Sequence, residues 1–223
     1  NVSEFTAVME EKLKAGLDIL FIGFSSGLST TYQSGAIACG ELREKYPERK
    51  LIAIDSLCAS LGEGLLVLEA ARMRKAGASM DEVLAMLRNY RSRMQQVFTV
   101  DDLMHLQRGG RVSRVTAMVG SVLQIKPILE SDEQGRIIVT GKVRGRKKAI
   151  RHLADALREK INPNEKQLIG IAHADNCEGT DYLLGLLRER GFTGECLEVY
   201  YEPVTGAHVG PGTVALFFYG TEK

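Results

Sequence analysis

The sequence has almost no surplus of charge of either sign. Of its 223 residues, 29 are Lys or Arg and 28 are Asp or Glu, so the formal net charge is +1. A domain that attracts nucleic acid through bulk electrostatics carries a basic surplus, which is missing here. Aromatic residues do not interleave with the basic run of the chain, which also disfavours single-stranded nucleic acid. We therefore expect no nucleic-acid partner.

Long apolar runs and paired cysteines are absent too. No segment approaches the roughly 18 to 20 apolar residues that span a bilayer, and the opening NVSEF lacks the basic start and apolar core of a signal peptide. Cys39, Cys58, Cys177 and Cys196 form no CxxC pair, so a zinc site is not expected. Scattered cysteines of this kind are typical of reduced thiols. We expect a cytoplasmic protein without a metal.

Alternating apolar and helical segments predict an α/β fold. LDILFIGF at 17–24 and LIAID at 51–55 are continuous apolar runs of the kind found in buried parallel strands, and a helical pattern follows each. VFTV at 97–100 predicts a third strand of this unit, and two helices broken at Gly109 and Gly110 are expected after it. Further on, ILES and RIIVTGK predict a hairpin turning at Gly135. The remaining segments predict strands at QLIGIAHA, CLEVYYE and TVALFFYG, helices at RKKAIRHLADALREKI and DYLLGLLRERG, and a loop at PVTGAHVGPG.

The change of pattern near Pro127 predicts two domains. The first, residues 1–125, should hold a mostly parallel sheet between helices, and the second, residues 126–223, a mixed sheet with helices. No Pro-, Gly- or Ser-rich linker separates them, and domains joined so directly often bind a ligand in the cleft between them. The chain begins at Asn1 and soon enters a strand, so we expect the first domain to lack its N-terminal part.

The segment FIGFSSGLSTTYQS gathers hydroxyl groups where a strand gives way to a helix. Ser25, Ser26, Ser29, Thr30 and Thr31 lie where free helix amides bind anionic oxygen, although some of them could simply cap the helix. The lysine of a P-loop is missing, which disfavours a nucleoside triphosphate. A carboxylate or a single phosphate fits this loop better.

The same segment contains a GxSxG match, which suggests an alternative function. Ser25 would be the nucleophile of a serine hydrolase or esterase, and Asp175 and His208 follow in the chain order of the α/β-hydrolases. In that fold several strands precede the nucleophile, whereas only 24 residues precede Ser25 here. The pattern is therefore a motif without its usual structural context.

A late glycine-rich segment, GAHVGPG, carries the most promising histidine. Its glycines let a backbone approach a ligand closely, and His208 can donate to an anion or act as an acid or base. A purely structural role is the alternative for His208. We expect His105, His152 and His173 to be structural.

Basic residues concentrate in KVRGRKKAIR at 142–151 and in RGGRVSR at 108–114. Such a run is usually a solvated helix face. If the two segments lie side by side, they form a docking surface for an acidic partner or a phosphate instead.

Six segments together resemble the DegV family of bacterial fatty-acid-binding proteins. They are SSGLSTTYQSG, IDSLCASLGEGLLVLEAARM, DDLMHLQRGGRVSR, LQIKPIL, GKVRGRKKAI and GAHVGPG. The resemblance implies two α/β domains holding one long-chain fatty acid between them. It also implies a carrier and not an enzyme: a separate ATP-binding subunit of fatty acid kinase phosphorylates the carboxylate, and the acyl phosphate enters phospholipid synthesis. No cofactor besides the bound fatty acid is implied, and transient membrane contact would suit this role.

The resemblance also assigns residues by motif. Ser29 of GLSTTY would contact the fatty-acid carboxylate, with Ser26 as a nearby alternative. His208 of GAHVGPG would reach the same carboxylate or its phosphate. Arg111 of GGRVSR and Arg144 of KVRGRKK would belong to the surface that docks the kinase subunit.

Two departures from the family pattern stand out. The family usually has glycine where this chain has Thr30, so the turn must differ if that glycine needs positive φ. The family also has a further strand upstream, followed by a loop whose threonine touches the carboxylate. Neither matches a segment of this chain, so we expect one carboxylate ligand to be missing.

Overall fold

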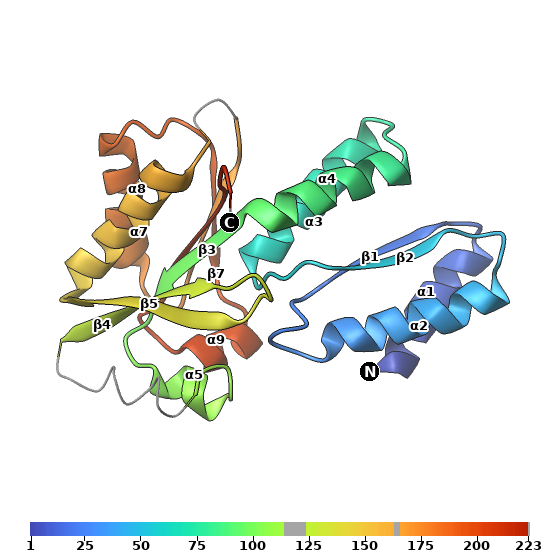
Figure 1. Cartoon of the computed structure of the whole chain (residues 1–223), viewed down its shortest axis with the longest axis horizontal. Helices are drawn as coiled ribbons and strands as arrows, with labels where there is room; N and C mark the ends of the chain where they lie inside the picture. The colour runs from blue at the N-terminus through green and yellow to red at the C-terminus, as the bar shows by residue number, and fades with distance from the viewer. Residues whose placement is uncertain (114–123, 163–165, 223) are drawn as a thin grey trace.

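The computed structural model of the chain describes residues 1–113, 124–162 and 166–222, and it contains two sheets (Figure 1). One sheet has two strands in the order β1-β2, and the other has six in the order β5-β4-β3-β8-β6-β7. The strands are β1 Ile19–Gly23, β2 Leu51–Asp55, β3 Met94–Thr99, β4 Ile125–Ser131, β5 Ile137–Arg144, β6 Ile169–His173, β7 Cys196–Tyr200 and β8 Val214–Tyr219. The helices are α1 Val2–Lys14, α2 Thr31–Lys45, α3 Leu61–Lys75, α4 Met80–Arg93, α5 Met104–Arg108, α7 Arg146–Lys160, α8 Cys177–Glu189 and α9 Pro203–Val209.

The small sheet forms a lobe with α1 and α2. Strands β1 and β2 pair in parallel, with Ile19 opposite Leu51 and Gly23 opposite Asp55, and α2 makes the crossover between them. Apolar residues of α1 and α2, including Leu13 and Ala38, bury the outer face of this sheet. The β1–α2 and β2–α3 loops leave the carboxyl ends of the two strands, which is where α/β folds place ligand sites.

The larger sheet has a helix layer on each face. Helices α7 and α8 cover one face, around buried residues such as Leu153, Leu183 and Phe218. Helices α3 and α4 cover the other face and lie between the two sheets (Figure 1). Because Ile54 of β2 and Phe217 of β8 belong to the same buried cluster, the two lobes share one core.

Strand β3 departs from its predicted place. The sequence predicts it in the first unit, but Val97 pairs with Leu216 of β8 on one side and Glu130 of β4 on the other. Antiparallel pairing on both sides buries all six β3 residues, and a short apolar run cannot by itself indicate which strands it will join. The sheets therefore divide before Met94, and the predicted boundary near residue 125 does not coincide with that division.

The hairpin prediction is confirmed, because β4 and β5 pair antiparallel and Gly135 has φ +71° in the turn between them. The loop prediction for PVTGAHVGPG is wrong, because Pro203–Val209 form helix α9. The Glu202 carboxylate accepts hydrogen bonds from the amides of Val204 at 2.6 Å and Thr205 at 2.9 Å, and proline suits the first helical turn. The second helix predicted after Gly110 lies outside the described residues. In the described ranges, no helix combines the length and apolar character that crossing a membrane needs.

Candidate ligand-binding cavity

A cavity of about 390 Å³ lies where the loops of the small lobe meet the larger sheet, and its volume falls in the usual range for small-molecule sites. Its walls come from the β1–α2 and β2–α3 loops, from β3, β5 and β8, and from α5 and α9. Most of the lining is apolar. The apolar side chains are Phe24, Leu28, Ala59, Phe98, Leu106, Ile137, Val204, Val209 and Phe217.

Ser29, which the family resemblance assigns to the ligand carboxylate, lines the cavity just before α2. Its Oγ lies 2.8 Å from Thr31 Oγ1 and accepts a hydrogen bond from the Thr31 amide at 3.2 Å. The side chain therefore sits at a helix N-terminus, where partial positive charge favours an anion. Thr30 has φ −79°, so this loop needs no glycine at the position where the family usually has one.

Arg111, which the family resemblance assigns to a docking surface, lines the cavity. Its Nε donates to the carbonyl of Leu28 at 3.1 Å, and its Nη1 donates to the carbonyl of Gly109. These bonds hold the guanidinium against the β1–α2 loop. A guanidinium has five N–H donors, so further donors remain to face an anionic group in the cavity.

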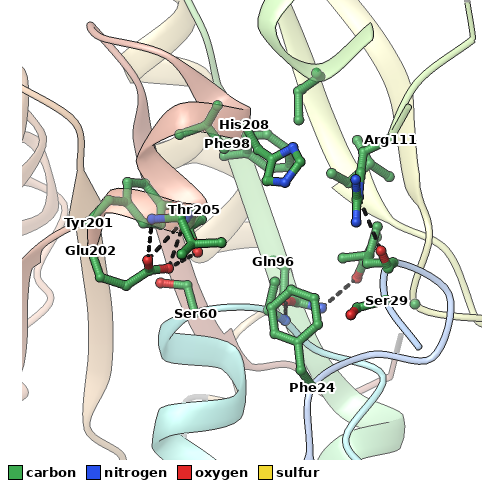
Figure 2. Close-up of a pocket in the computed structure, with 18 of the residues that line it drawn as sticks. Phe24, Ser29, Ser60, Gln96, Phe98, Arg111, Tyr201, Glu202, Thr205 and His208 are labelled. Carbon is green, nitrogen blue, oxygen red and sulfur yellow. Dashed lines mark hydrogen bonds between the residues drawn. The ribbon is translucent and has the colours of Figure 1, made fainter. Parts of the chain in front are cut away.

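His208 reaches the cavity from α9 and packs closely on Gly109 of the segment after α5. A Cβ atom at position 109 would lie 2.1 Å from His208 Nδ1, so the imidazole occupies space that only a glycine leaves free. Figure 2 shows His208, Arg111 and Ser29 bordering one side of the cavity. The fold therefore brings together three predicted residues that are far apart in the sequence.

Ser26 and Ser25 do not belong to the cavity lining. The Ser26 amide donates to Asp55 Oδ1 at 3.2 Å, so the backbone of Ser26 holds the β1–α2 loop against the end of β2. Ser25 is fully buried, and its Oγ donates to the carbonyl of Gly135 at 2.8 Å. A hydrolase nucleophile needs an accessible Oγ, so the geometry does not support the serine-hydrolase alternative.

Arg144 is the last residue of β5 and is exposed outside the cavity lining. Two other cations nearby are already engaged. Lys126 and Arg146 lie 2.7 and 3.4 Å from Asp101 Oδ1. Arg146 of the basic run is therefore ion-paired within the protein, whereas Arg144 remains available to a partner.

Three polar residues of the lining could not be predicted as site residues from any sequence pattern. Gln96 of β3 is buried, and its amide accepts from the Ala59 amide at 2.8 Å and donates to Ser131 Oγ at 2.9 Å. Ser60 and Tyr201 lie on another side of the cavity (Figure 2). Burial raises the pKa of the Tyr201 phenol, and the nearby Ser60 hydroxyl acts in the opposite direction.

The carboxylate of Glu202 lines the same side of the cavity as Tyr201 but is occupied by its own helix. Burial acts to raise its pKa, yet hydrogen bonds from Thr205 and from the first amides of α9 hold the pKa below its usual value. His208 adds to this lowering. In the part of the chain that the structure describes, no three His, Cys, Asp or Glu side chains gather as a metal site. The cavity thus offers an apolar interior with a cation and hydroxyls at one side.

Comparison with known proteins matches this chain to one family over nearly its whole length. The family model described as "Uncharacterised protein, DegV family" matches residues 1–221. The DegV domain-containing protein CPE0026 of Clostridium perfringens is 43% identical over 224 residues, which cover 100% of this chain and 77% of that protein.

Solved structures agree with the match. A DegV family protein from Thermus thermophilus, described for its fatty acid binding, is 30% identical to this chain and has a TM-score of 0.87. The match covers 99% of this chain and 77% of that one. A DegV family protein from Ruminococcus gnavus, refined with vaccenic acid, is 26% identical with a TM-score of 0.85, and the match covers 96% of this chain and 76% of that one. This chain therefore belongs to the DegV family.

Proposed function

We propose that the chain binds a long-chain fatty acid in this cavity. The observation that carries the proposal is the arrangement of the lining, an apolar interior with Ser29, Arg111 and His208 at one side. These residues would hold the carboxylate. The acyl chain would lie against Phe24, Phe98 and their apolar neighbours. The fatty acids described for the Thermus thermophilus and Ruminococcus gnavus relatives support this choice of ligand.

The energetics favour the tail as the source of affinity. Burying about 14 methylenes at roughly 0.8 kcal/mol each contributes on the order of 10 kcal/mol before the cost of association. The carboxylate contacts then fix the position of the chain in the cavity. Replacing Ser29 or His208 should for this reason affect the headgroup more than retention of the tail.

The test uses the purified chain as expressed. We expect mass spectrometry of the denatured protein to release a long-chain fatty acid in a stoichiometric amount. Protein that is consistently empty and also fails to bind added palmitate would refute the proposal. A fluorophosphonate probe tests the hydrolase alternative in the same preparation, and we expect no labelling that depends on Ser25.

We further propose that the chain is a carrier that presents the carboxylate to a separate ATP-binding kinase subunit, whose acyl phosphate product feeds phospholipid synthesis. The family resemblance of KVRGRKK and the exposure of Arg144 outside the cavity support this. We expect Arg144→Ala to slow phosphorylation of the bound fatty acid by the kinase subunit, whereas Arg158→Ala, an exposed arginine later on α7, should not. Equal phosphorylation rates for the two variants would show that Arg144 is not part of the docking surface.

A further inference from the structure

Ser60 occupies a helix-capping position without capping the helix. It is the N-cap residue of α3, where a serine side chain normally accepts a hydrogen bond from the first turn, but no such bond forms. Its backbone has φ +50° and ψ −129°, a conformation that costs a residue with a Cβ energy and that is found preferentially at functional sites. The side chain lines the ligand cavity instead.

The Ser60 hydroxyl lies near the Tyr201 phenol, close enough to oppose the rise that burial causes in its pKa. Tyr201 is 8% exposed and also lines the cavity. The two hydroxyls carry two hydrogens, and at most one of these can be shared between them. At least one donor and several lone pairs therefore remain at an apolar cavity, where an unused hydrogen-bonding group costs free energy.

Two other polar groups nearby are already engaged within the protein. The Gln96 amide is used by the Ala59 amide, the Leu57 carbonyl and Ser131. The Thr205 hydroxyl is held by the Glu202 carboxylate. The Ser60–Tyr201 pair, by contrast, keeps hydrogen-bonding capacity for a ligand on this side of the lining.

The pair lies away from the groups that would hold the carboxylate. Figure 2 shows Ser60 and Tyr201 across the cavity from Ser29 and Arg111, with Gln96 between the two sets. Tyr201 precedes the first residue of α9 and His208 lies near its end, and the seven residues of this helix span about 10 Å at the rise of an α-helix. A fatty acid held by its carboxylate near His208 would bring the middle of its chain, and not its headgroup, to the hydroxyl pair.

We propose that the cavity takes a fatty acid whose chain bears a hydroxyl group near its middle. The ligand hydroxyl would accept from the free hydrogen of the Ser60–Tyr201 pair and donate to one of its lone pairs. This inference rests on the proposed fatty-acid site and specifies its substrate class. An unsubstituted chain would leave the pair unsatisfied at the same point.

The test compares dissociation constants for four ligands of equal chain length: stearate and hydroxystearates with the hydroxyl at the α, a mid-chain or the ω carbon. Delipidated protein and competition against a fluorescent fatty acid provide the readout. The mid-chain isomer should bind roughly three- to tenfold more tightly than stearate, the range expected for one net hydrogen bond. The α and ω isomers should bind no more tightly than stearate.

Variants test whether Ser60 and Tyr201 cause the preference for mid-chain hydroxystearate over stearate. Tyr201→Phe and Ser60→Ala should each bring the ratio between stearate and mid-chain hydroxystearate toward one. Tyr200→Phe removes the same atom from the neighbouring tyrosine, which is 60% exposed and outside the lining, and should preserve the ratio. Circular dichroism checks that each variant is folded, and if Tyr201→Phe does not fold, Ser60→Ala and the wild-type isomer series decide.

The outcomes separate the two proposals. If stearate binds but all isomers bind equally, or if the preference survives both Tyr201→Phe and Ser60→Ala, the hydroxy-acid inference is overturned and the fatty-acid site stands. If none of the four ligands binds, the fatty-acid site itself is refuted, and this inference falls with it.

Discussion

The Oγ of Ser25 donates a hydrogen bond of 2.8 Å to the carbonyl of Gly135, across 110 residues of sequence. The bond joins the β1–α2 loop of the small lobe to the hairpin turn of the larger sheet. The same Oγ accepts from the Gly27 amide at 3.2 Å. A Cβ at position 135 would lie 2.2 Å from this oxygen, so the hairpin glycine allows the approach. One buried serine therefore ties together the two parts of the chain that border the cavity.

Ser25→Ala should destabilise the protein without creating or abolishing any esterase activity. The substitution leaves the Gly135 carbonyl and the Gly27 amide without this partner, which costs about 1–3 kcal/mol. At this chain length each kcal/mol lowers Tm by roughly 2–4 °C. Thermal unfolding measures the effect, and Ser3→Ala on the exposed surface of α1 is the control. A Tm equal to that of the control would show that the Ser25 bond contributes nothing.

Arg111→Ala should weaken binding of a free fatty acid much more than binding of its methyl ester. Hydrogen bonds to a charged partner contribute about 1.5–3 kcal/mol, so a loss of roughly ten- to a hundredfold in affinity for palmitate is expected. Arg144→Ala serves as the control, because Arg144 lies outside the cavity lining. Competition binding with palmitate and methyl palmitate measures the difference. Parallel losses for acid and ester would show that Arg111 supports the wall and not the carboxylate.

Gly109→Ala should displace the His208 imidazole while sparing the fold. Residue 109 has φ −73°, which alanine adopts without strain, but the new Cβ would lie 2.1 Å from His208 Nδ1. We expect palmitate affinity to fall about as far as in His208→Ala. Gly40→Ala places its Cβ in open space on α2 and should bind as the wild type does, with a small gain in stability from helix propensity. Undiminished affinity in Gly109→Ala would mean that palmitate binding does not depend on the observed position of the His208 imidazole.

Glu63→Gln should make the protein more stable at neutral and mildly basic pH. Burial, and secondarily the charge of Asp55, raises the pKa of Glu63 from 4.5 to about 7. The folded state thus binds this proton more tightly than the unfolded state, so stability falls as pH rises from about 4.5 to about 7 and this penalty is fully present above that window. In Glu63→Gln, stability should no longer fall with pH across this window, and the variant should melt a few degrees higher than the wild type at about pH 8.

The control for Glu63 is Glu178→Gln, an exposed acid in the first turn of α8. Thermal unfolding at several pH values compares both variants with the wild type. The wild type and Glu63→Gln should converge toward acidic pH, where the wild-type carboxyl is protonated. Curves that stay parallel across the whole range would show that Glu63 does not titrate in this window.

Local patterns predicted much of this fold correctly. The hairpin at Gly135 follows from a glycine with φ +71° between two apolar runs, and β1, α2 and β2 follow from their hydrophobic spacing. Helix α9 was missed because its glycines suggest a loop, whereas the Glu202 carboxylate satisfies its first amides and stabilises it. The sheet membership of β3 depends on pairing with β4 and β8, which no local pattern encodes.

For the cavity too, local sequence patterns identify some of the lining residues, and long-range packing determines the others. Ser29 and His208 stand in recognisable motifs, and the structure brings both to the cavity. Arg111 also stands in a motif, but its basic neighbours suggest a surface role, and only the bond to the Leu28 carbonyl reveals where it points. Gln96 and Tyr201 lie in or beside ordinary strands, so their position at the cavity depends on how two lobes formed by distant parts of the sequence pack together.

Phe98, Leu106, Val209 and Phe217 belong both to the buried cluster between the two sheets and to the lining of the cavity. An occupant of the cavity would therefore pack against the same apolar cluster that joins the two sheets. Binding that is confined to the folded state adds RT ln(1 + [L]/Kd), about 2.7 kcal/mol at a hundredfold excess of ligand over Kd. The melting temperature of this protein should thus report directly on how much of it carries lipid, and a purified sample should melt in two populations whenever it is only partly loaded with a slowly dissociating ligand.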